Sequence, residues 1–442
     1  MNLNFKKNEF FRGALSILKA LRDRGFDSYF VGGCVRDAIL GVEIKDIDIV
    51  TSALPSQINS IFDRTHNIGA AFGIVNVVIN SINYEVATFR KETSYKDGRH
   101  PDSVVFAKTP QEDAMRRDFT INALFYDPFL DSILDYSEGL LDLKRGLLRT
   151  IGKAEGRFNE DYLRMLRAIR FTLRFGFDTA PEIISSIKLM APKTLLLSKE
   201  RVRDELTGIL TGPNPDKGLD MLYQSGILKE LLPDIFAMKG IKQPPEYHPE
   251  GDVFEHTKLM LSHMPCPSDE LAWAILLHDV GKPSTFKIRD DGRETFVCHA
   301  DCGSMISEKI LKELKFPALF TNNVCYAVKN HMRFASVTEM RPSKYKAIIA
   351  ASTFPLELEL HRIDCISSNK FTDSYTFLLD KLIEQNGERI LPERLLKGKD
   401  LIELGFKPGP EFSRILEKIE EMQHDKLLNT REDALEYIRR NF

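Results

Sequence analysis

The pattern of hydrophobic and polar residues changes about a third of the way along the chain. In the first part, short segments alternate apolar and polar residues, which is the period of a half-buried strand. Beyond residue 148, apolar residues recur at the spacing of an amphipathic helix. The sequence therefore predicts an α+β first part followed by an all-α remainder. The expected strands are residues 28–31, 47–50, 73–79, 83–88, 103–106 and 132–135.

Proline-containing stretches interrupt the helical part and suggest where domains meet. They lie at residues 212–215 and 243–249, and the second is the best candidate for a linker between two catalytic units. Near the end of the chain, apolar residues between Phe412 and Ile419 follow helical spacing and predict an amphipathic helix. We find no internal repeat. The domains expected from these features are residues 1–148, 149–242, 243–385 and 386–442.

Length and composition are typical of an enzyme with several packed domains: 442 residues, of which 43% are hydrophobic and 28% charged. The six cysteines are scattered without a complete zinc-binding pattern, which indicates a reduced compartment. Residues 1–11 have no apolar core of signal-peptide length, and no apolar run approaches the roughly 18 residues of a membrane span. We therefore expect a cytoplasmic protein that is neither exported nor embedded in a membrane.

Charge is distributed unevenly, although the net charge is only −3. Residues 139–176 contain nine Lys or Arg against four Asp or Glu, a local excess of five positive charges. A basic stretch in an acidic chain favours a path for a polyanion such as nucleic acid. A solvated helix face explains the charge alone equally well.

A glycine pair follows the first expected strand and precedes a short helix. Without a Cβ, Gly32 and Gly33 let backbone N–H groups approach a phosphate, and Arg36 adds a fixed cation beside them. Asp46 and Asp48 follow in a segment that is expected to be a strand, where alternate side chains share one face. Two carboxylates on one face suit Mg²⁺, which is usually held together with substrate phosphates. The order and closeness of the two motifs predict a nucleotide site.

Further polar residues extend this candidate site. Glu85 lies in an alternating segment and is expected to bring a third carboxylate towards the metal ions. Arg117, Asp118 and Asn122 lie at the expected start of a helix, where the helix dipole favours anions, and they offer a grip for a triphosphate or a ribose. Taken singly, these arginines are more typical of surface charge.

The sharpest feature is a helical segment that begins near residue 160. Asp161, Arg164 and Arg167 are predicted to share one stripe of this helix. A carboxylate accepts a hydrogen bond from the exocyclic amino group of cytosine or adenine, and a guanidinium donates to the neighbouring ring nitrogen. Uracil and guanine present a carbonyl there and would face the carboxylate as acceptor against acceptor. Such a pair would select C and A without a template. An ion pair within the helix is the alternative.

The second half of the chain contains a series of histidines and aspartates on a mainly helical background. Side chains of this kind enclose one or two divalent metals that activate water for phosphoester hydrolysis. A single histidine is usually a packed or surface residue, but the whole series predicts a metal site. Its members are His256, His278, Asp279, His299, His331 and Asp364.

Residues 29–210 resemble the head and neck of the bacterial class II tRNA nucleotidyltransferases, a family of CCA-adding, CC-adding, A-adding and poly(A)-adding enzymes. The resemblance implies a polymerase-β-like nucleotidyltransferase head, built from a mixed sheet with helices. It also implies two Mg²⁺ ions on Asp46 and Asp48. The motifs that carry the resemblance, in the order of the family, are residues 32–37, 46–48, 116–118, 135–142 and 160–164.

The same resemblance implies roles for other residues. Gly33, Arg36 and Arg117 would contact the nucleotide, and Asp161 with Arg164 would read the edge of its base. Residues 198–205 resemble the last neck motif of the family, which supports the fold, and we assign them no chemistry. The residues expected at the incoming base or its phosphates are Asp161, Arg164, Arg167 and Arg170.

Residues 250–368 resemble the HD superfamily of metal-dependent phosphohydrolases, through the strings around His256, His278, His299 and His331. The resemblance implies phosphatase or 2′,3′-cyclic phosphodiesterase activity and a divalent metal of unknown identity. The four expected domains then become a nucleotidyltransferase head, a helical neck and RNA-binding region, an HD domain, and a helical tail that helps to hold the tRNA elbow.

Together these features predict an enzyme that adds C and A from CTP and ATP to the 3′ end of tRNA, with an accessory HD phosphohydrolase activity. A-adding, CC-adding and poly(A)-adding activities remain alternatives. Residues 91–106 resemble an unshortened flexible loop of the family, which favours an enzyme able to add the terminal A. An alternative from a different class of enzyme is that the chain is chiefly an HD phosphohydrolase with an RNA-binding head.

Overall fold

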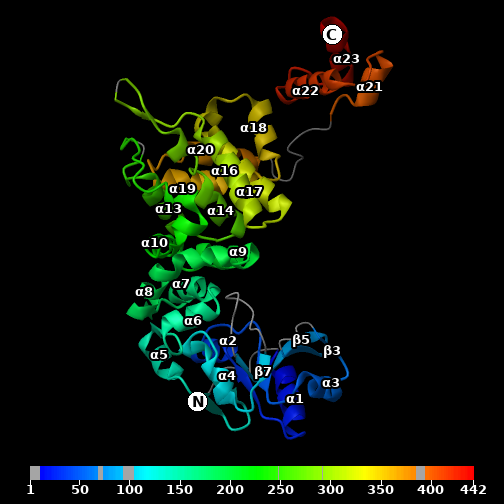
Figure 1. Cartoon of the computed structure of the whole chain (residues 1–442). Coiled ribbons are helices and arrows are strands. Elements are labelled where there is room, and N and C mark those ends of the chain that lie inside the picture. Colours follow the sequence, from blue (N-terminus) through cyan, green and yellow to red (C-terminus); the bar gives the residue numbers. More distant parts are fainter. Residues whose placement is uncertain (1–9, 68–72, 93–103, 247, 291, 385–393) are drawn as a thin grey trace. The chain divides into compact units, whose positions relative to one another are not determined.

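The computed structural model describes residues 10–67, 73–92, 104–246, 248–290, 292–384 and 394–442 (Figure 1). The chain divides into two compact units, Met1–Pro233 and Asp234–Phe442. The division into four domains stays a prediction.

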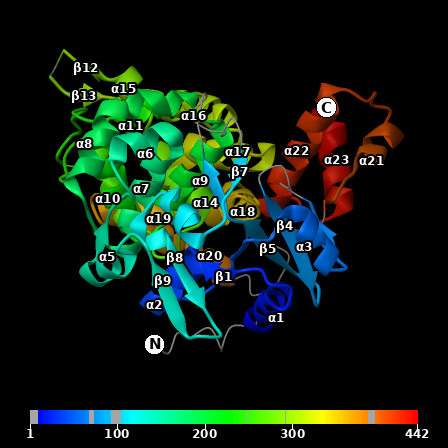
Figure 2. The same ribbon diagram turned by 60° about the horizontal axis from the view of Figure 1, so that its bottom comes forward.

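The first unit begins with a mixed seven-stranded sheet in the order β3-β4-β5-β2-β1-β8-β9, part of which is seen in Figure 2. Strands β2 and β5 pair in parallel, and the other neighbours pair antiparallel. This sheet confirms the predicted α+β architecture. Its strands are β1 (Ser28–Val31), β2 (Ile49–Thr51), β3 (Thr65–His66), β4 (Ile74–Ile79), β5 (Ile82–Thr88), β8 (Leu124–Asp127) and β9 (Ser132–Asp135).

Two differences from the sequence prediction concern the strands nearest the glycine turn. The strand expected at residues 47–50 begins at Ile49, so Asp46 and Asp48 lie in the irregular segment that leads into β2. Strand β8 was not expected, because all four of its residues are buried and the segment does not alternate. A separate two-stranded ribbon pairs β6 (Arg90–Glu92) with β7 (Val104–Phe106).

Short helices cover this sheet and connect its strands. Helix α1 buries one apolar stripe that includes Ile17 and Leu21. A core cluster beneath the glycine turn contains Val31, Phe89 and Phe125. The helices of this part are α1 (Phe11–Arg22), α2 (Gly33–Leu40), α3 (Pro55–Ile61), α4 (Pro110–Met115) and α5 (Gly139–Arg145).

The rest of the first unit is helical, as the sequence predicted, apart from the small parallel pair β10 (Leu147–Leu148) and β11 (Asp178–Thr179). The central helix is α7, which packs against α9 and α10. Most of its apolar residues are buried, while Arg167, Arg170 and Arg174 line a cavity of this unit. The helices are α6 (Ala154–Glu160), α7 (Leu163–Phe175), α8 (Pro181–Met190), α9 (Lys199–Leu210), α10 (Pro215–Gln224) and α11 (Ile227–Leu231).

The second unit is almost entirely helical. Helix α14 (Asp269–Leu277) is apolar on nearly all sides and forms its centre, with Trp273 fully buried. A short ribbon pairs β12 (Lys287–Ile288) with β13 (Glu294–Thr295). The surrounding helices are α13 (Val253–Ser262), α15 (Lys282–Thr285), α16 (His299–Glu313), α17 (Ala318–Asn330), η5 (His331–Glu339), α18 (Pro342–Ile349), α19 (Phe354–Ser367) and α20 (Asp373–Glu384).

Three helices at the end of the chain, α21 (Gly398–Glu403), α22 (Pro410–His424) and α23 (Arg431–Asn441), form a core of their own around Ile415 and Ile419. The amphipathic helix expected in this region lies within α22. Arg341 of the preceding helical body bonds Glu421 at 2.6 Å. Among the described residues, no helix has both the length and the apolar character needed to cross a membrane.

Candidate functional site

A cavity of about 380 Å³ in the first unit collects most residues of the predicted nucleotide site. Its lining comes from the glycine turn, the segment before β2, the turn after α4 and the exposed face of α7. Ten predicted residues line it: Gly32, Gly33, Arg36, Asp46, Asp48, Arg117, Asp118, Asn122, Arg167 and Arg170. The other predicted residues of this unit, Glu85, Asp161 and Arg164, lie outside the lining.

The glycine turn has a backbone conformation that requires glycine. Gly32 adopts φ +73° and ψ −125°, and a Cβ there would come within 3.2 Å of the Arg117 guanidinium. Helix α2 begins at the next residue, so its first N–H groups have no acceptor within the helix. Arg36 is buried, bonds Asp37 at 2.7 Å, and is also hydrogen-bonded to Asn122. The turn therefore offers free N–H groups beside a guanidinium held in place.

The carboxylates of Asp46 and Asp48 flank the buried side chain of Ile47 and both line the cavity. Glu85 lies beside Asp48, because the parallel register pairs Ile49 with Val86. Burial, followed by the charges of Glu85 and Asp46, raises the pKa of Asp48 to about 6. No described residue forms a hydrogen bond or ion pair with the side chains of Asp46 and Asp48 that offsets this repulsion. Two carboxylates that line one cavity fit a divalent cation such as Mg²⁺, which takes further oxygen ligands from water and substrate phosphates.

The turn after α4 differs from the expected start of a helix. It contains only a single 3₁₀ turn, η3 (Thr120–Asn122), and Asp118 before it does not point freely into the cavity. Asp118 accepts hydrogen bonds from Arg167 at 2.8 and 2.9 Å and from Asn122 at 3.0 Å. Although burial alone would raise its pKa, Arg167 and Asn122 lower the pKa of Asp118 well below its usual range. In this structure Asp118 positions Arg167.

Helix α7 presents arginines that are held by carboxylates from other elements. Arg170 bonds Glu205 of α9 at 2.6 Å, and Arg174 bonds Asp37 of α2 at 2.9 Å. The guanidinium of Arg170 also lies 4.8 Å from the centre of the Phe171 ring. Lining residues that sequence reasoning missed are Asp37, Lys45, Phe171 and Arg174. Arg174 had a signal, because it follows Arg170 by one helical turn.

Asp161 and Arg164 do not share one helix, contrary to the expected stripe. Helix α6 ends at Glu160, Asp161 is extended, and α7 begins at Leu163. The carboxylate of Asp161 bonds Arg201 of α9 at 2.6 Å. The sequence analysis left open an ion pair between Asp161 and an arginine of its own helix. Among the ion pairs of the described residues, Asp161 pairs with Arg201 of α9 instead.

Arg164 is held by a separate group of acceptors. It bonds Glu160 at 2.5 Å, and it donates to the carbonyls of Arg157 at 3.0 Å and Arg116 at 3.2 Å. The side chain is buried, with 8% of the residue exposed. The guanidinium is therefore fixed in direction independently of Asp161.

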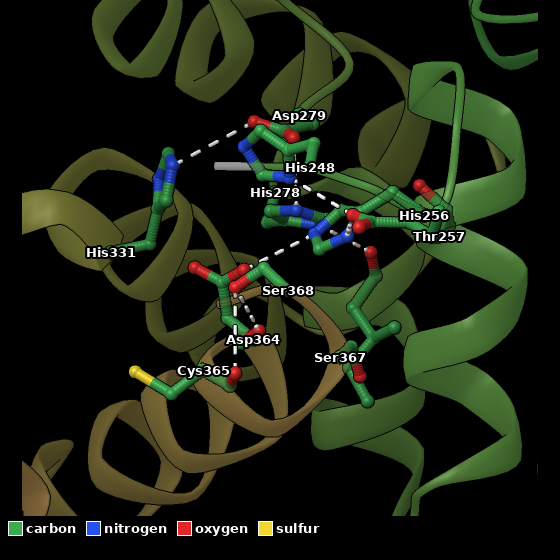
Figure 3. Close-up of polar contacts among 12 residues, drawn as sticks. His248, His256, Thr257, His278, Asp279, His331, Asp364, Cys365, Ser367 and Ser368 are labelled. Atoms are coloured by element: carbon green, nitrogen blue, oxygen red, sulfur yellow. Dashed lines mark hydrogen bonds and ion pairs between the residues drawn. The ribbon is translucent and has the colours of Figure 1, made fainter. Parts of the chain in front are cut away.

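In the second unit, the six predicted metal ligands come together from five helices or their ends. Figure 3 labels five of them, His256, His278, Asp279, His331 and Asp364. His256 Nε2 lies 3.1 Å from Asp364 Oδ1, and His278 Nε2 lies 3.1 Å from Asp279 Oδ2. His299 and His331 approach Asp279 Oδ1 at 3.6 and 3.7 Å, and their Nε2 atoms lie 3.2 Å apart. Imidazole and carboxylate groups that converge on one centre can hold a divalent metal.

Unsatisfied polar atoms support this interpretation of the cluster. His256 Nε2, His278 Nε2 and Asp279 Oδ1 are buried, and none has a hydrogen-bond partner with good geometry among the described residues. Glu250 Oε1 lies 2.5 Å from Nδ1 of His256, a contact that fixes the ring and would leave Nε2 to bind a metal. The donor set therefore fits a metal.

The cluster opens into a cavity of about 690 Å³. Lys282 Nζ, one of its lining groups, lies 2.6 Å from Asp279. Burial raises the pKa of Asp279, but His278 and Lys282 outweigh it and lower that pKa well below its usual range. Sequence reasoning missed Glu250, Lys282 and His248, although all three lie close to predicted ligands in the chain.

Three models of known protein families match the parts of the chain that contain the two sites. Residues 28–149 match the poly A polymerase head domain, residues 176–239 match the probable RNA and SrmB-binding site of polymerase A, and residues 251–352 match the HD domain. The fold and the sites thus define a nucleotidyltransferase that carries an HD domain.

Individual relatives show which nucleotidyltransferases this chain is similar to in sequence and structure. A CCA-adding enzyme of Ligilactobacillus salivarius is 32% identical over 444 residues, which span 96% of this chain and 95% of the relative. A CCA-adding enzyme of Staphylococcus aureus is 44% identical over 212 residues, 48% of this chain and 53% of the relative. The crystal structure of the Bacillus stearothermophilus CCA-adding enzyme in complex with CTP has a TM-score of 0.74 and 28% identity, and the match covers 98% of both chains. This chain belongs to the CCA-adding enzymes, which confirms the resemblance.

Proposed function

We propose that this chain adds C and A, taken from CTP and ATP, to the 3′ end of tRNA without a nucleic-acid template. The observation that carries the proposal is a cavity that combines two carboxylates, for which the described residues offer no ion-pair partner, with a phosphate-binding turn and a row of arginines. The names of the relatives support it, because they are CCA-adding enzymes, and one is solved with CTP.

Asp46 and Asp48 are proposed to hold two Mg²⁺ ions, with Glu85 beside them. When bound, these ions lower the pKa of the attacking 3′-hydroxyl and neutralise the leaving pyrophosphate. The chain itself holds the triphosphate: the N–H groups at the start of α2 and the Arg117 guanidinium face the same cavity as the carboxylates. The tRNA 3′-oxygen forms the new bond to the α-phosphorus, and the bond from that phosphorus to pyrophosphate breaks.

Arg170 and the neighbouring arginines of α7 extend this grip along the cavity. Their carboxylate partners fix the direction of each guanidinium before a substrate arrives, so little reorganisation is needed on binding. Asp161 and Arg164 are proposed to read the base. The carboxylate accepts from the exocyclic amino group of C or A, and the guanidinium donates to the neighbouring ring nitrogen.

Incubation with three tRNA transcripts tests this function. One ends at the discriminator nucleotide, one at the first C and one at the second C, and each receives CTP and ATP separately. We expect C addition to the first two transcripts and A addition to the third. Products limited to C or to A would identify a CC-adding or an A-adding enzyme, and long A tails would identify a poly(A) polymerase. The loop at residues 91–106, which favoured terminal A addition, lies largely outside the described residues.

We propose a second activity for the HD cluster, the metal-dependent hydrolysis of phosphoesters. The observation that favours it is that five of the six predicted ligands line one cavity together with Lys282, while the sixth, His256, lies 3.1 Å from Asp364. The metal would be held by the four histidines, Asp279 and Asp364, and it would supply an activated water when bound. The side chain of Lys282 would then attract the phosphate of the substrate.

Hydrolysis of a nucleoside 2′,3′-cyclic phosphate and of a simple phosphomonoester, with Mn²⁺, Co²⁺, Ni²⁺ or Mg²⁺, tests this second activity. His278→Ala should abolish it. His263→Ala is the matched control, because this histidine is bonded to Ser367 rather than directed into the cavity. If no metal stimulates hydrolysis, the cluster serves only the fold or the binding of tRNA. We also propose that the protein acts in the cytoplasm, in keeping with six cysteines that are all free thiols.

A further inference from the structure

Among the described residues, three hydrogen bonds are donated to the carboxylate of Asp161. Oδ1 accepts from the backbone N–H of Leu163 at 3.0 Å and from Arg201 Nη1 at 3.3 Å, while Oδ2 accepts from Arg201 Nη2 at 2.6 Å. The two contacts with Arg201 form a bidentate fork, which fixes both the position and the plane of the carboxylate. The backbone contact ties the same group to the start of α7.

These contacts leave the carboxylate with a single acceptor position. An ionised carboxylate offers about four lone-pair directions, and the three donors occupy both of those on Oδ1 and one on Oδ2. The remaining direction belongs to Oδ2, on a side chain that is still 18% exposed. A group with one free acceptor position and no proton matches one N–H of an exocyclic amino group.

Arg201 does not stabilise the helix in which it lies. It lies in the first turn of α9, where the helix dipole disfavours a positive charge. The contact that compensates for this is the fork to Asp161, in a different element and 40 residues away in the sequence.

Arg201 also keeps Asp161 apart from the other base-reading group. Asp161 precedes α7 and Arg164 lies in its first turn, so an ion pair between these two close neighbours in the sequence is the obvious alternative. Such a pair would mask the acceptor and the donor together. Instead each group has its own partner, Arg201 for the carboxylate and Glu160 for the guanidinium.

We propose that Arg201 is a positioning residue for nucleotide selection: it holds Asp161 as a fixed single acceptor, so that CTP and ATP are accepted and UTP and GTP rejected. This inference rests on the proposed function of Asp161 in reading the base. Without Arg201, the carboxylate can turn towards Arg164 or accommodate a water beside the carbonyl of uracil, and discrimination falls.

Competition between CTP and UTP on a transcript that ends at the discriminator tests this inference. In Arg201→Gln, we expect the ratio of C to U incorporation to fall on the order of tenfold, since the correct hydrogen bond is weakened and the wrong base is rejected less strongly. Arg201→Lys keeps the charge but loses the fork, and should fall between wild type and Arg201→Gln. Arg203→Gln is the matched control, because Arg203 bonds the exposed Asp204 on the same helix.

The variant Asp161→Ala distinguishes base reading by Asp161 from the positioning role of Arg201. If Asp161→Ala relaxes selection and Arg201→Gln does not, Arg201 has no positioning role, while base reading by Asp161 stands. If Asp161→Ala leaves selection unchanged, base reading itself is wrong. Equal loss of C and U incorporation in Arg201→Gln, with an unchanged ratio, would show a structural role only and would overturn the inference. Should Arg201→Gln fail to fold, the same ratio measured for Arg201→Lys decides between these outcomes.

Discussion

Replacing Asp48 by asparagine should stabilise the metal-free protein while it removes nucleotide addition. The side chain keeps its shape but loses the charge that Glu85 and Asp46 repel. In the wild-type fold, burial together with these two carboxylates raises the pKa of Asp48 from 3.8 to about 6. The positive charge of Arg117 offsets only part of this effect, and no described residue forms an ion pair with Asp48, so a penalty remains until a cation binds.

The size of the change in the free energy of unfolding follows from the linkage between proton binding and folding. Because the pKa of Asp48 is higher in the folded chain, the folded chain holds this proton more tightly than the unfolded chain does. Stability therefore declines as pH rises through the window between the two values, and the full penalty is present above pH 6. A shift of about two pKa units corresponds to about 3 kcal/mol. The partial exposure of Asp48 makes this an upper bound.

Thermal unfolding in EDTA measures this effect, at about pH 5 and at about pH 8. We expect Asp48→Asn to exceed wild type in stability at the higher pH, and the difference to shrink at the lower pH. Mg²⁺ should stabilise wild type more than the variant, and turnover of the variant should fall by more than about 100-fold. Asp63→Asn, which changes an exposed carboxylate elsewhere in this unit, is the control. A variant that is less stable than wild type in EDTA, or that keeps Mg²⁺-dependent addition, would refute this reasoning.

Three further predictions concern other parts of the two sites. Glu250→Gln should weaken binding of Mn²⁺ to the HD cluster by about 10–100-fold, because the carboxylate fixes the ring of His256; unchanged affinity in a calorimetric titration would contradict this. Asp279→Asn should abolish phosphoester hydrolysis yet leave C and A addition intact, and a loss of both activities would show that the two sites are not independent. Gly32→Ala should destabilise the fold by about 1–3 kcal/mol, because φ is +73° there, and should raise the KM for CTP; denaturant unfolding and steady-state kinetics that both match wild type would show that the turn tolerates a side chain.

The fold was predictable where one face of an element is buried and the other is not. Strands β1 and β9 coincide with the expected segments, and the helical part follows its apolar spacing. Strand β8 escaped detection because Leu124–Asp127 is buried on both faces and shows no alternation. The break before α7 also escaped, although aspartate is a favoured residue at helix starts and Asp161 accepts from the N–H of Leu163.

The sequence predicted which residues gather at the sites better than which residues pair. The glycine turn and the carboxylates are close in sequence, so their proximity follows from local geometry. The contacts of Arg174 with Asp37, and of Arg201 with Asp161, span 137 and 40 residues and depend on how helices pack. Local patterns contain no information on such distant partners, and these contacts set the direction of each guanidinium.

Anomalous diffraction from crystals soaked with Mn²⁺ and a non-hydrolysable CTP analogue tests the central claim most directly. The account predicts manganese peaks within coordination distance of the carboxylates of Asp46 and Asp48, next to the phosphates of the nucleotide. A nucleotide bound in this cavity with no peak at the two carboxylates would contradict it.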